Sequence, residues 1–186
     1  MSEDARLIEE ALAGDSGSFG QLVCKYQNRL FNTLVHCIGT REEAEDVAQE
    51  AFVQAFVKLQ SFKGHSAFYT WLYRIAFNIL ISRRRRKRPE SSVEQSRESS
   101  GHEPQSDEEA PSQRLEREER AVQVHAALAE LGEEYRTVLV LREIEGCHYE
   151  TISEMLDLPI GTVRSRLHRG RMRLRELLRG TLLENT

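Results

Sequence analysis

Cysteine is scarce in this chain, and its arrangement argues against two kinds of protein. The 186 residues hold three cysteines, an odd number, with no Cys-x-x-Cys pair, so neither a disulfide framework nor a structural zinc site is indicated. The pair Cys147-His148 stands without a second pair at ligand spacing. We expect no metal and no cofactor, and reduced cysteines that behave as small apolar residues in the cytoplasm.

Long apolar runs, strand patterns and catalytic clusters are also missing. The chain has no run of about 18 apolar residues and no signal-peptide pattern, so membrane insertion is not expected. No segment alternates as a β-strand does, and no glycine-rich phosphate loop is present. A nuclease would need acids clustered with His or Lys around a metal, and no such cluster is found. The chain is therefore not expected to be an enzyme.

Helical periodicity and unevenly placed charge are what the sequence does contain. Hydrophobic residues make up 39% and charged residues 30% of the chain, which suits a soluble, all-α protein. The net charge is only −4, but basic residues concentrate in 83–88 and 164–179, and acidic ones in 42–50 and 90–109. Two basic blocks in a mildly acidic chain indicate nucleic-acid binding through those blocks alone.

A segment rich in Glu, Ser and Pro divides the chain. Residues 89–113 have almost no large apolar side chain, so we predict a flexible acidic linker between two small helical domains, 1–88 and 114–186. The linker is either a simple tether or a screen for the basic blocks. The helices expected in the first domain are 4–13, one from Asp15 or Ser18 to Gly39, one opened by Thr40 and Glu43 as a capping box, and 68–88. Those expected in the second are 114–131, 133–145, 149–156 and 162–179.

The last expected helix follows a short turn, 157–161, and is rich in arginine. Residues 162–179 hold seven Arg and one acid, Glu176, so a helix-turn-helix that reads DNA is favoured over a merely solvated charged face. Side chains at the start of such a helix enter the major groove, and those further along meet phosphate. The expected base-reading group is Thr162, Arg164, Ser165, Arg166, His168 and Arg169, and the expected phosphate group is Arg171, Arg173 and Arg175.

Two other helical faces have no settled role from spacing alone. Asp46, Gln49, Glu50 and Val53 share one face of the third helix, which is either a solvated acidic surface or a contact surface. The stretch 68–88 crowds five rings into ten positions and then runs into six consecutive cationic residues. Its rings are either core or a platform on which the bases of opened DNA stack.

Three segments in this order resemble a known family. They are EEAEDVAQEAFVQAF, FKGHSAFYTWLYRIAFN and YETISEMLDLPIGTVRSRLHRGRMRLRELL, and they are similar to the motifs of extracytoplasmic-function (ECF) sigma factors of the envelope-stress type. The resemblance covers nearly all of the chain except the linker. One position departs from the pattern, because the helix start at His148-Tyr149-Glu150-Thr151 lacks the usual capping box, so this helix end is expected to fray.

The resemblance implies partners and a role for each domain. Region two, the first domain, would dock on the clamp of the largest subunit of core RNA polymerase through Asp46, Gln49, Glu50 and Val53. It would open the minus-ten promoter element through Phe62, Lys63, Gly64, His65, Ser66, Trp71, Tyr73, Arg74 and Asn78, with Arg83, Arg84, Arg85 and Arg86 on the DNA backbone. Region four, the second domain, would read the minus-thirty-five element and meet the flap of the second-largest subunit. An anti-sigma factor is a further expected partner.

One rival hypothesis keeps the DNA binding but removes the polymerase. A free-standing helix-turn-helix regulator would explain the second domain. It would leave the ring-rich helix and the acidic face without a role, and it would need a dimer interface or a ligand domain that the sequence does not indicate.

Overall fold

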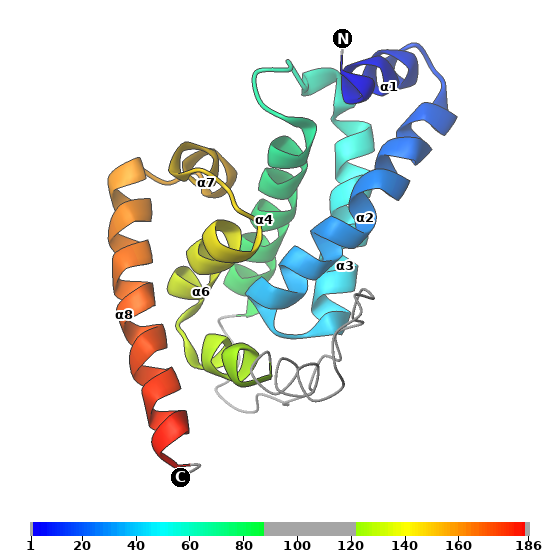
Figure 1. Cartoon of the computed structure of the whole chain (residues 1–186). Helices are drawn as coiled ribbons and strands as arrows, with labels where there is room; N and C mark the ends of the chain where they lie inside the picture. Colours follow the sequence, from blue (N-terminus) through cyan, green and yellow to red (C-terminus); the bar gives the residue numbers. More distant parts are fainter. Residues whose placement is uncertain (1, 88–121, 185–186) are drawn as a thin grey trace, which may run out of the picture.

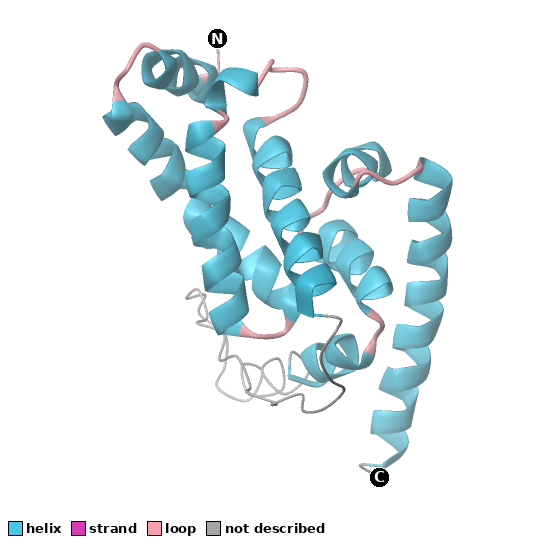
Figure 2. Ribbon diagram, turned by 180° about the vertical axis from the view of Figure 1, so that it is seen from behind, coloured by secondary structure: helices cyan, strands magenta, loops and turns pink. Residues whose placement is uncertain are grey.

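The computed structural model describes residues 2–87 and 122–184, and in these ranges the chain is helical with connecting loops and no strand (Figures 1 and 2). The predicted all-α class is confirmed. The segment predicted as a linker, 89–113, lies outside the described residues. None of the described helices is both long and apolar enough to cross a bilayer. Within the same ranges, no group of three or more His, Cys, Asp or Glu side chains is arranged to hold a metal ion.

The first half, residues 2–87, begins with helices whose ends the sequence explains. Helix α1 spans Glu3–Leu12, and α2 spans Ser16–Ile38. The Asp15 carboxylate accepts the N–H of Gly17 at 2.9 Å and caps α2, so of the two predicted caps, Asp15 and Ser18, the structure has the first. At its other end Gly39 has φ 92°, a left-handed conformation that glycine adopts without strain, and this residue ends the helix.

Helices α3, Arg41–Val57, and α4, Phe68–Lys87, complete this half, with a short 3-10 turn, Leu59–Ser61, between them. The predicted capping box at Thr40 is wrong, because the Thr40 side chain makes no capping hydrogen bond and its carbonyl alone accepts the N–H of Ala44. Small buried residues on α3, such as Ala51, let it lie close to α2 and α4. Leucines and other apolar residues from all three helices then fill one core.

The second half, residues 122–184, is built from shorter helices and one long one. A helical segment at 122–130 is followed by α6, Glu133–Leu139. The sequence predicted one regular helix over 133–145, but the last part, Val140–Ile144, is a π-helix. Helix α7, Tyr149–Leu156, starts at His148 without a side-chain cap, which agrees with the missing capping box. Helix α8, Ile160–Glu184, starts earlier and ends later than the predicted 162–179.

Helices α7 and α8 form the predicted helix-turn-helix. Asp157 ends α7 in a left-handed conformation, φ 52°, and the chain turns at once into α8. Val163 and Leu167 are buried and hold the start of α8 to its neighbours. Further along, Gly170 lies so close to α6 that a Cβ atom there would stand 3.1 Å from Leu139 and 3.3 Å from Tyr135. The absence of a side chain at Gly170 lets the two helices approach this closely without displacing Leu139.

The two halves pack against each other, which the sequence did not predict. Helix α4 contacts α7, which runs across it, while α2 contacts α6 and the π-helical segment (Figure 1). Buried side chains of both halves join one continuous cluster, including Leu72 of α4 and Ile152 of α7. The described part of the chain therefore has two motifs but one shared core.

Candidate protein and nucleic-acid interfaces

The acidic face of α3 is exposed and is tied to the start of the basic block. Asp46, Gln49 and Val53 are exposed, and Glu50 is half-buried. Arg83 of α4 donates from Nη2 to Glu50 at 2.7 Å and lies 3.5 Å from Asp46 through Nη1. The Glu50 contact is the main cause that raises the pKa of Arg83. Arg83, predicted to lie on the DNA backbone, is thus engaged with the acidic face in this conformation.

An exposed apolar strip adjoins the acidic face; the sequence analysis had placed Val53 on that face but missed Phe56 and Val57, the other two residues of the strip. Val53 is 64%, Phe56 49% and Val57 75% exposed. The ring of Phe56 meets the core in an edge contact with Phe19, at 5.0 Å between ring centres. The signal that could have found this strip is its i, i+3, i+4 spacing directly beside the acids. Charge next to exposed apolar area is typical of a protein-binding surface.

The loop before α4 and the first turns of α4 form a small cavity. Phe62 of the loop packs on Trp71 at 5.2 Å and on Phe68 at 5.9 Å between ring centres, which fixes the loop against the helix. Gly64, at φ 71°, turns the loop, and Lys63 and His65 stay exposed. The cavity, of about 180 Å³, is lined by His65, Ser66, Thr70, Trp71, Arg74 and Glu154.

Polar side chains on α4 continue from this cavity along one exposed face. Arg74 and Asn78 are both exposed and lie one turn apart, so they share that face. Glu154, which also lines the cavity, comes from α7 in the second half. The arrangement brings most of the predicted minus-ten group together.

Tyr73 is the predicted minus-ten residue that the structure places elsewhere. Its side chain is 0% exposed, its hydroxyl lies 3.4 Å from the Cys37 sulfur, and its ring stacks on Phe77. Burial raises its pKa well above the usual value. In this conformation Tyr73 is a core residue, because the face of α4 that carries it packs inward while Arg74 and Asn78 point to solvent.

The start of α8 presents most of the predicted base-reading side chains. Arg164, Ser165, His168 and Arg169 are exposed, on the side away from buried Val163. Thr162 is half-buried, and its carbonyl accepts the Ser165 hydroxyl at 3.0 Å. These residues occupy the end of the helix that can enter a major groove.

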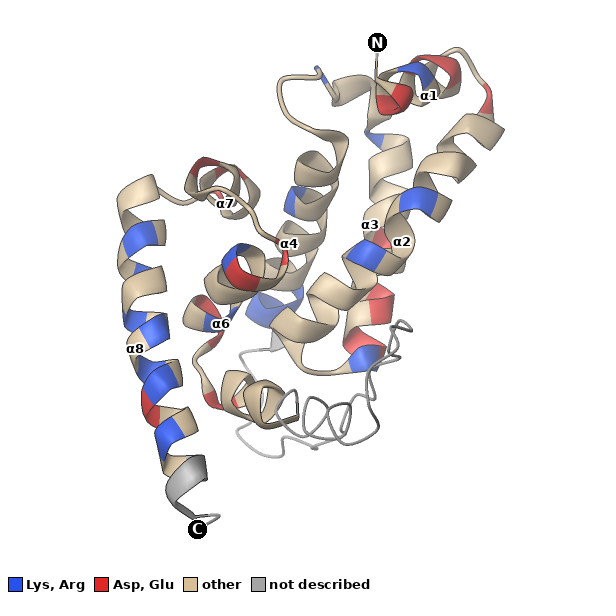
Figure 3. Ribbon diagram, viewed as in Figure 1, with Lys and Arg blue, Asp and Glu red and all other residues tan. Residues whose placement is uncertain are grey.

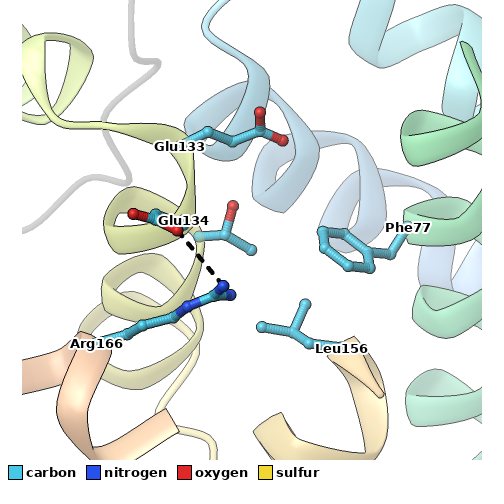
Figure 4. A pocket seen from close by; sticks show the side chains of 6 residues that line it. Phe77, Glu133, Glu134, Leu156 and Arg166 are labelled. Atoms are coloured by element: carbon cyan, nitrogen blue, oxygen red, sulfur yellow. Dashed lines mark ion pairs between the residues drawn. The ribbon is translucent and has the colours of Figure 1, made fainter. Parts of the chain in front are cut away.

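Arg166 faces a different way. It points into a cavity of about 140 Å³ between the halves, where its Nη2 lies 3.4 Å from Glu134 (Figure 4). Phe77 of α4 and Leu156 of α7 line the same cavity. Arg166 therefore holds α8 to α6 in this conformation instead of extending into solvent with its neighbours.

Basic positions repeat along α8 and at the end of α4 (Figure 3). Arg171 donates to Glu143 at 2.6 Å, and this bond raises its pKa. Arg173 lies over the ring of Tyr135. Arg84 pairs with Glu133 of the second half. The exposed members of the predicted phosphate groups also include Arg85, Arg86 and Arg175.

Comparisons with known proteins match both halves. The family described as "Sigma-70 region 2" matches residues 22–90, and "Sigma-70, region 4" matches residues 121–174. The chain is 42% identical over 190 residues to the RNA polymerase sigma-H factor of Pseudomonas aeruginosa, covering 99% of this chain and 98% of that protein. It is 36% identical over 179 residues to the ECF RNA polymerase sigma factor SigW of Bacillus subtilis, covering 92% and 95%.

A solved structure has the same fold. The sigma factor RpoE in complex with the anti-sigma factor NepR from Bartonella quintana superposes with a TM-score of 0.69 at 26% identity, covering 87% of this chain and 96% of that one.

Proposed function

The chain belongs to the sigma-70 family and to its ECF group, and from this premise we propose how its surfaces divide the work of starting transcription. It is a transcription initiation factor that binds core RNA polymerase and directs it to promoters. Residues 1–88 are the region-two domain, 89–113 a linker, and 114–186 the region-four domain. Each domain contributes one DNA-reading surface.

The α3 face docks on the polymerase. Asp46, Gln49 and Glu50 supply charge and hydrogen-bond acceptors, and Val53, Phe56 and Val57 supply apolar area that is otherwise exposed to water. A protein partner that covers both would gain from desolvating the apolar strip and from pairing the acids with its own cations. The clamp of the largest polymerase subunit is the proposed partner, and the flap of the second-largest subunit is the proposed partner of region four.

The cavity at the start of α4 holds a base of the opened minus-ten element. It has an aromatic wall, Trp71, together with hydroxyl and guanidinium donors from Ser66 and Arg74. A base taken out of the stack costs a few kcal/mol, which stacking on a ring and bonding at its edge can offset. Asn78, on the same face, can bond a neighbouring base edge.

Helix α8 reads the minus-thirty-five element. The observation that carries the whole proposal lies here: behind a tight turn, α8 exposes Arg164, Ser165, His168 and Arg169 while Val163 and Leu167 fix it to the domain. Arg can bond guanine through two parallel hydrogen bonds, and Ser can reach a base or a phosphate. Arg171, Arg173, Arg175 and the residues 83–86 are proposed to lie along phosphate.

The factor works in the cytoplasm, where its polymerase is, and is held inactive by an anti-sigma factor. Support comes from the similar RpoE chain, whose structure is a complex with the anti-sigma factor NepR. Run-off transcription with purified core polymerase tests the proposal. The full chain should give transcripts from some promoter templates that core polymerase alone does not, and the absence of any such transcript would refute it.

A further inference from the structure

Among the described residues, three ion pairs join the two halves, and all three have the same polarity. Arg29 Nε lies 2.8 Å from Glu145, Arg74 Nη2 lies 3.8 Å from Asp157, and Arg84 pairs with Glu133. In each pair the cation belongs to the first half and the carboxylate to the second. At these three ion pairs the second half therefore supplies negative charge to cations of the first half.

The pair at Glu145 is the best-built of the three. The Glu145 side chain is only 10% exposed, so its charge has been withdrawn from water. One carboxylate oxygen accepts from Arg29, and the other accepts from the Thr33 hydroxyl at 2.6 Å. A charge is buried at this depth only when such partners compensate its lost hydration.

The receptor for this carboxylate is organised within the first half. Thr33 lies 3.0 Å from the Tyr69 hydroxyl, and the guanidinium of Arg29 lies over the Tyr69 ring at 4.1 Å. Burial raises the pKa of Tyr69, so its hydroxyl stays protonated. Arg29, Thr33 and Tyr69, hereafter the carboxylate receptor, come from α2 and α4 and contact one another within the first half.

A second contact seals the same boundary at the end of α2. Arg136 of α6 donates from Nε to the Cys37 carbonyl at 2.8 Å, which satisfies an acceptor that the helix itself leaves open. Cys37 is 1% exposed, and burial raises the pKa of its thiol to about 11. The imidazoles of His36 and His125 stack across the boundary at 4.8 Å.

We propose that the carboxylate receptor is an intramolecular docking site for Glu145, through which region four closes over region two and keeps the free factor from binding promoter DNA. This inference rests on the proposed function, because that function identifies the DNA-binding side chains that the closed form occludes. In the closed form Arg74 and Arg84, both assigned to DNA, are occupied by carboxylates, and Glu154 lines the proposed base cavity. DNA and the second half thus compete for the same cations.

Glu145→Lys tests the docking site, and Glu143→Lys is its matched control. Both variants make the same charge change in the same stretch of chain, but Glu143 bonds Arg171 inside the second half. Adding Arg29→Glu to Glu145→Lys restores the pair with reversed signs. The full chain of each variant is treated with N-ethylmaleimide, and the modification of Cys37 and of exposed Cys24 is followed by mass spectrometry. The radius of gyration is measured by small-angle X-ray scattering.

Glu145→Lys should raise the alkylation rate of Cys37 by about tenfold relative to Cys24, because the variant loses the hydrogen bonds that the charged Glu145 carboxylate accepts from Arg29 and Thr33. It should also increase the radius of gyration. Glu143→Lys should change neither, and the reversed pair should restore both. Wild-type values in Glu145→Lys would overturn the docking site. The docking site would also be overturned if the Arg29→Glu, Glu145→Lys double variant showed the same increases in alkylation rate and radius of gyration, since these would point to general destabilisation.

Binding of a promoter fragment without polymerase tests the occlusion. Glu145→Lys should bind more tightly than the wild type and than Glu143→Lys, and unchanged binding in an opened variant would overturn the autoinhibition. Run-off transcription separates this from the proposed function. If the wild type gives no transcript with core polymerase, the proposed function fails whatever the scattering shows. If the wild type gives a transcript and Glu145→Lys behaves like the wild type in every measurement, only the docking site fails.

Discussion

Arg169 and Arg166 are neighbouring arginines, but replacing each of them separately by alanine should affect promoter preference differently. Arg169 is exposed on the outward side of α8, whereas Arg166 points toward Glu134 and the cavity beneath the helix. If α8 enters a major groove, only the outward residue can reach a base edge. Sequence alone placed both in the base-reading group, and the structure separates them.

The expected sizes follow from these surroundings. A bidentate Arg–guanine contact is worth about 1–3 kcal/mol of discrimination, so Arg169→Ala should lower preference at one promoter position by roughly 5- to 150-fold. Arg166 and Glu134 form a partly exposed pair at 3.4 Å, and such pairs contribute about 0–1 kcal/mol. Arg166→Ala should therefore lower the free energy of unfolding slightly and leave promoter preference unchanged.

Transcription from a library of minus-thirty-five variants, at several salt concentrations, measures both effects. Arg175→Ala serves as the control for phosphate contacts, because it should weaken all promoters equally and reduce the slope of log affinity against log salt by about 0.9. The reasoning is refuted if Arg166→Ala relaxes the preference while Arg169→Ala does not. It is also refuted if all three variants lose the same promoters in the same proportion.

Three further predictions follow from the first half. Asp46→Lys combined with Glu50→Lys should abolish binding to core polymerase in a pull-down while the circular dichroism spectrum stays helical, and retained affinity would remove the docking assignment. Asn78→Ala should reduce promoter opening about tenfold by permanganate footprinting, since a lost base contact costs about 1–3 kcal/mol, whereas Tyr73→Ala should instead lower the free energy of unfolding by about 3–5 kcal/mol in urea. Normal promoter opening in Asn78→Ala, or normal stability in Tyr73→Ala, would contradict these placements. The pKa of Cys37, raised by burial from 9.0 to about 11, means that the folded chain keeps a proton that the unfolded chain releases, so the free energy of unfolding should fall as pH rises from about 9 to 11. Cys37→Ala should flatten that decline in urea titrations, and an unchanged decline would show that the thiol does not cause it.

Helix boundaries were predicted well where a single residue dictates the local backbone. Asp15 and Gly39 set the ends of α2 by capping chemistry that depends on neighbours in sequence alone. The capping box at Thr40 failed because the Thr40 side chain accepts no capping hydrogen bond, although its backbone, at φ −121° and ψ 132°, is extended as at an ordinary helix start. The π-helix at Val140–Ile144 was missed because a dense apolar run reads the same in either helical form.

The candidate interfaces were harder to predict than the helix boundaries, because some of their contacts join residues that are far apart in the sequence. Residues 46–53 and 164–169 could be grouped from helical spacing, since each group lies on one helix. The bond between Thr33 and Glu145 joins positions 112 residues apart, and nothing local marks either residue as a partner. The burial of Tyr73 likewise depends on a distant partner, since its hydroxyl lies 3.4 Å from the sulfur of Cys37 on α2, 36 positions away, so a ring that looked suited to DNA proved to be core.

Gly170 makes α8 behave as a lever. The contact of this residue with α6 is a pivot, and Arg164 lies six residues away, about 9 Å along a stiff rod at 1.5 Å per residue. A methyl group at the pivot would have to push Leu139 aside or tilt the rod, and a tilt would displace the far end relative to the bases it faces. Promoter choice could therefore drift during evolution through a residue that never touches DNA, with every side chain that reads the bases left intact.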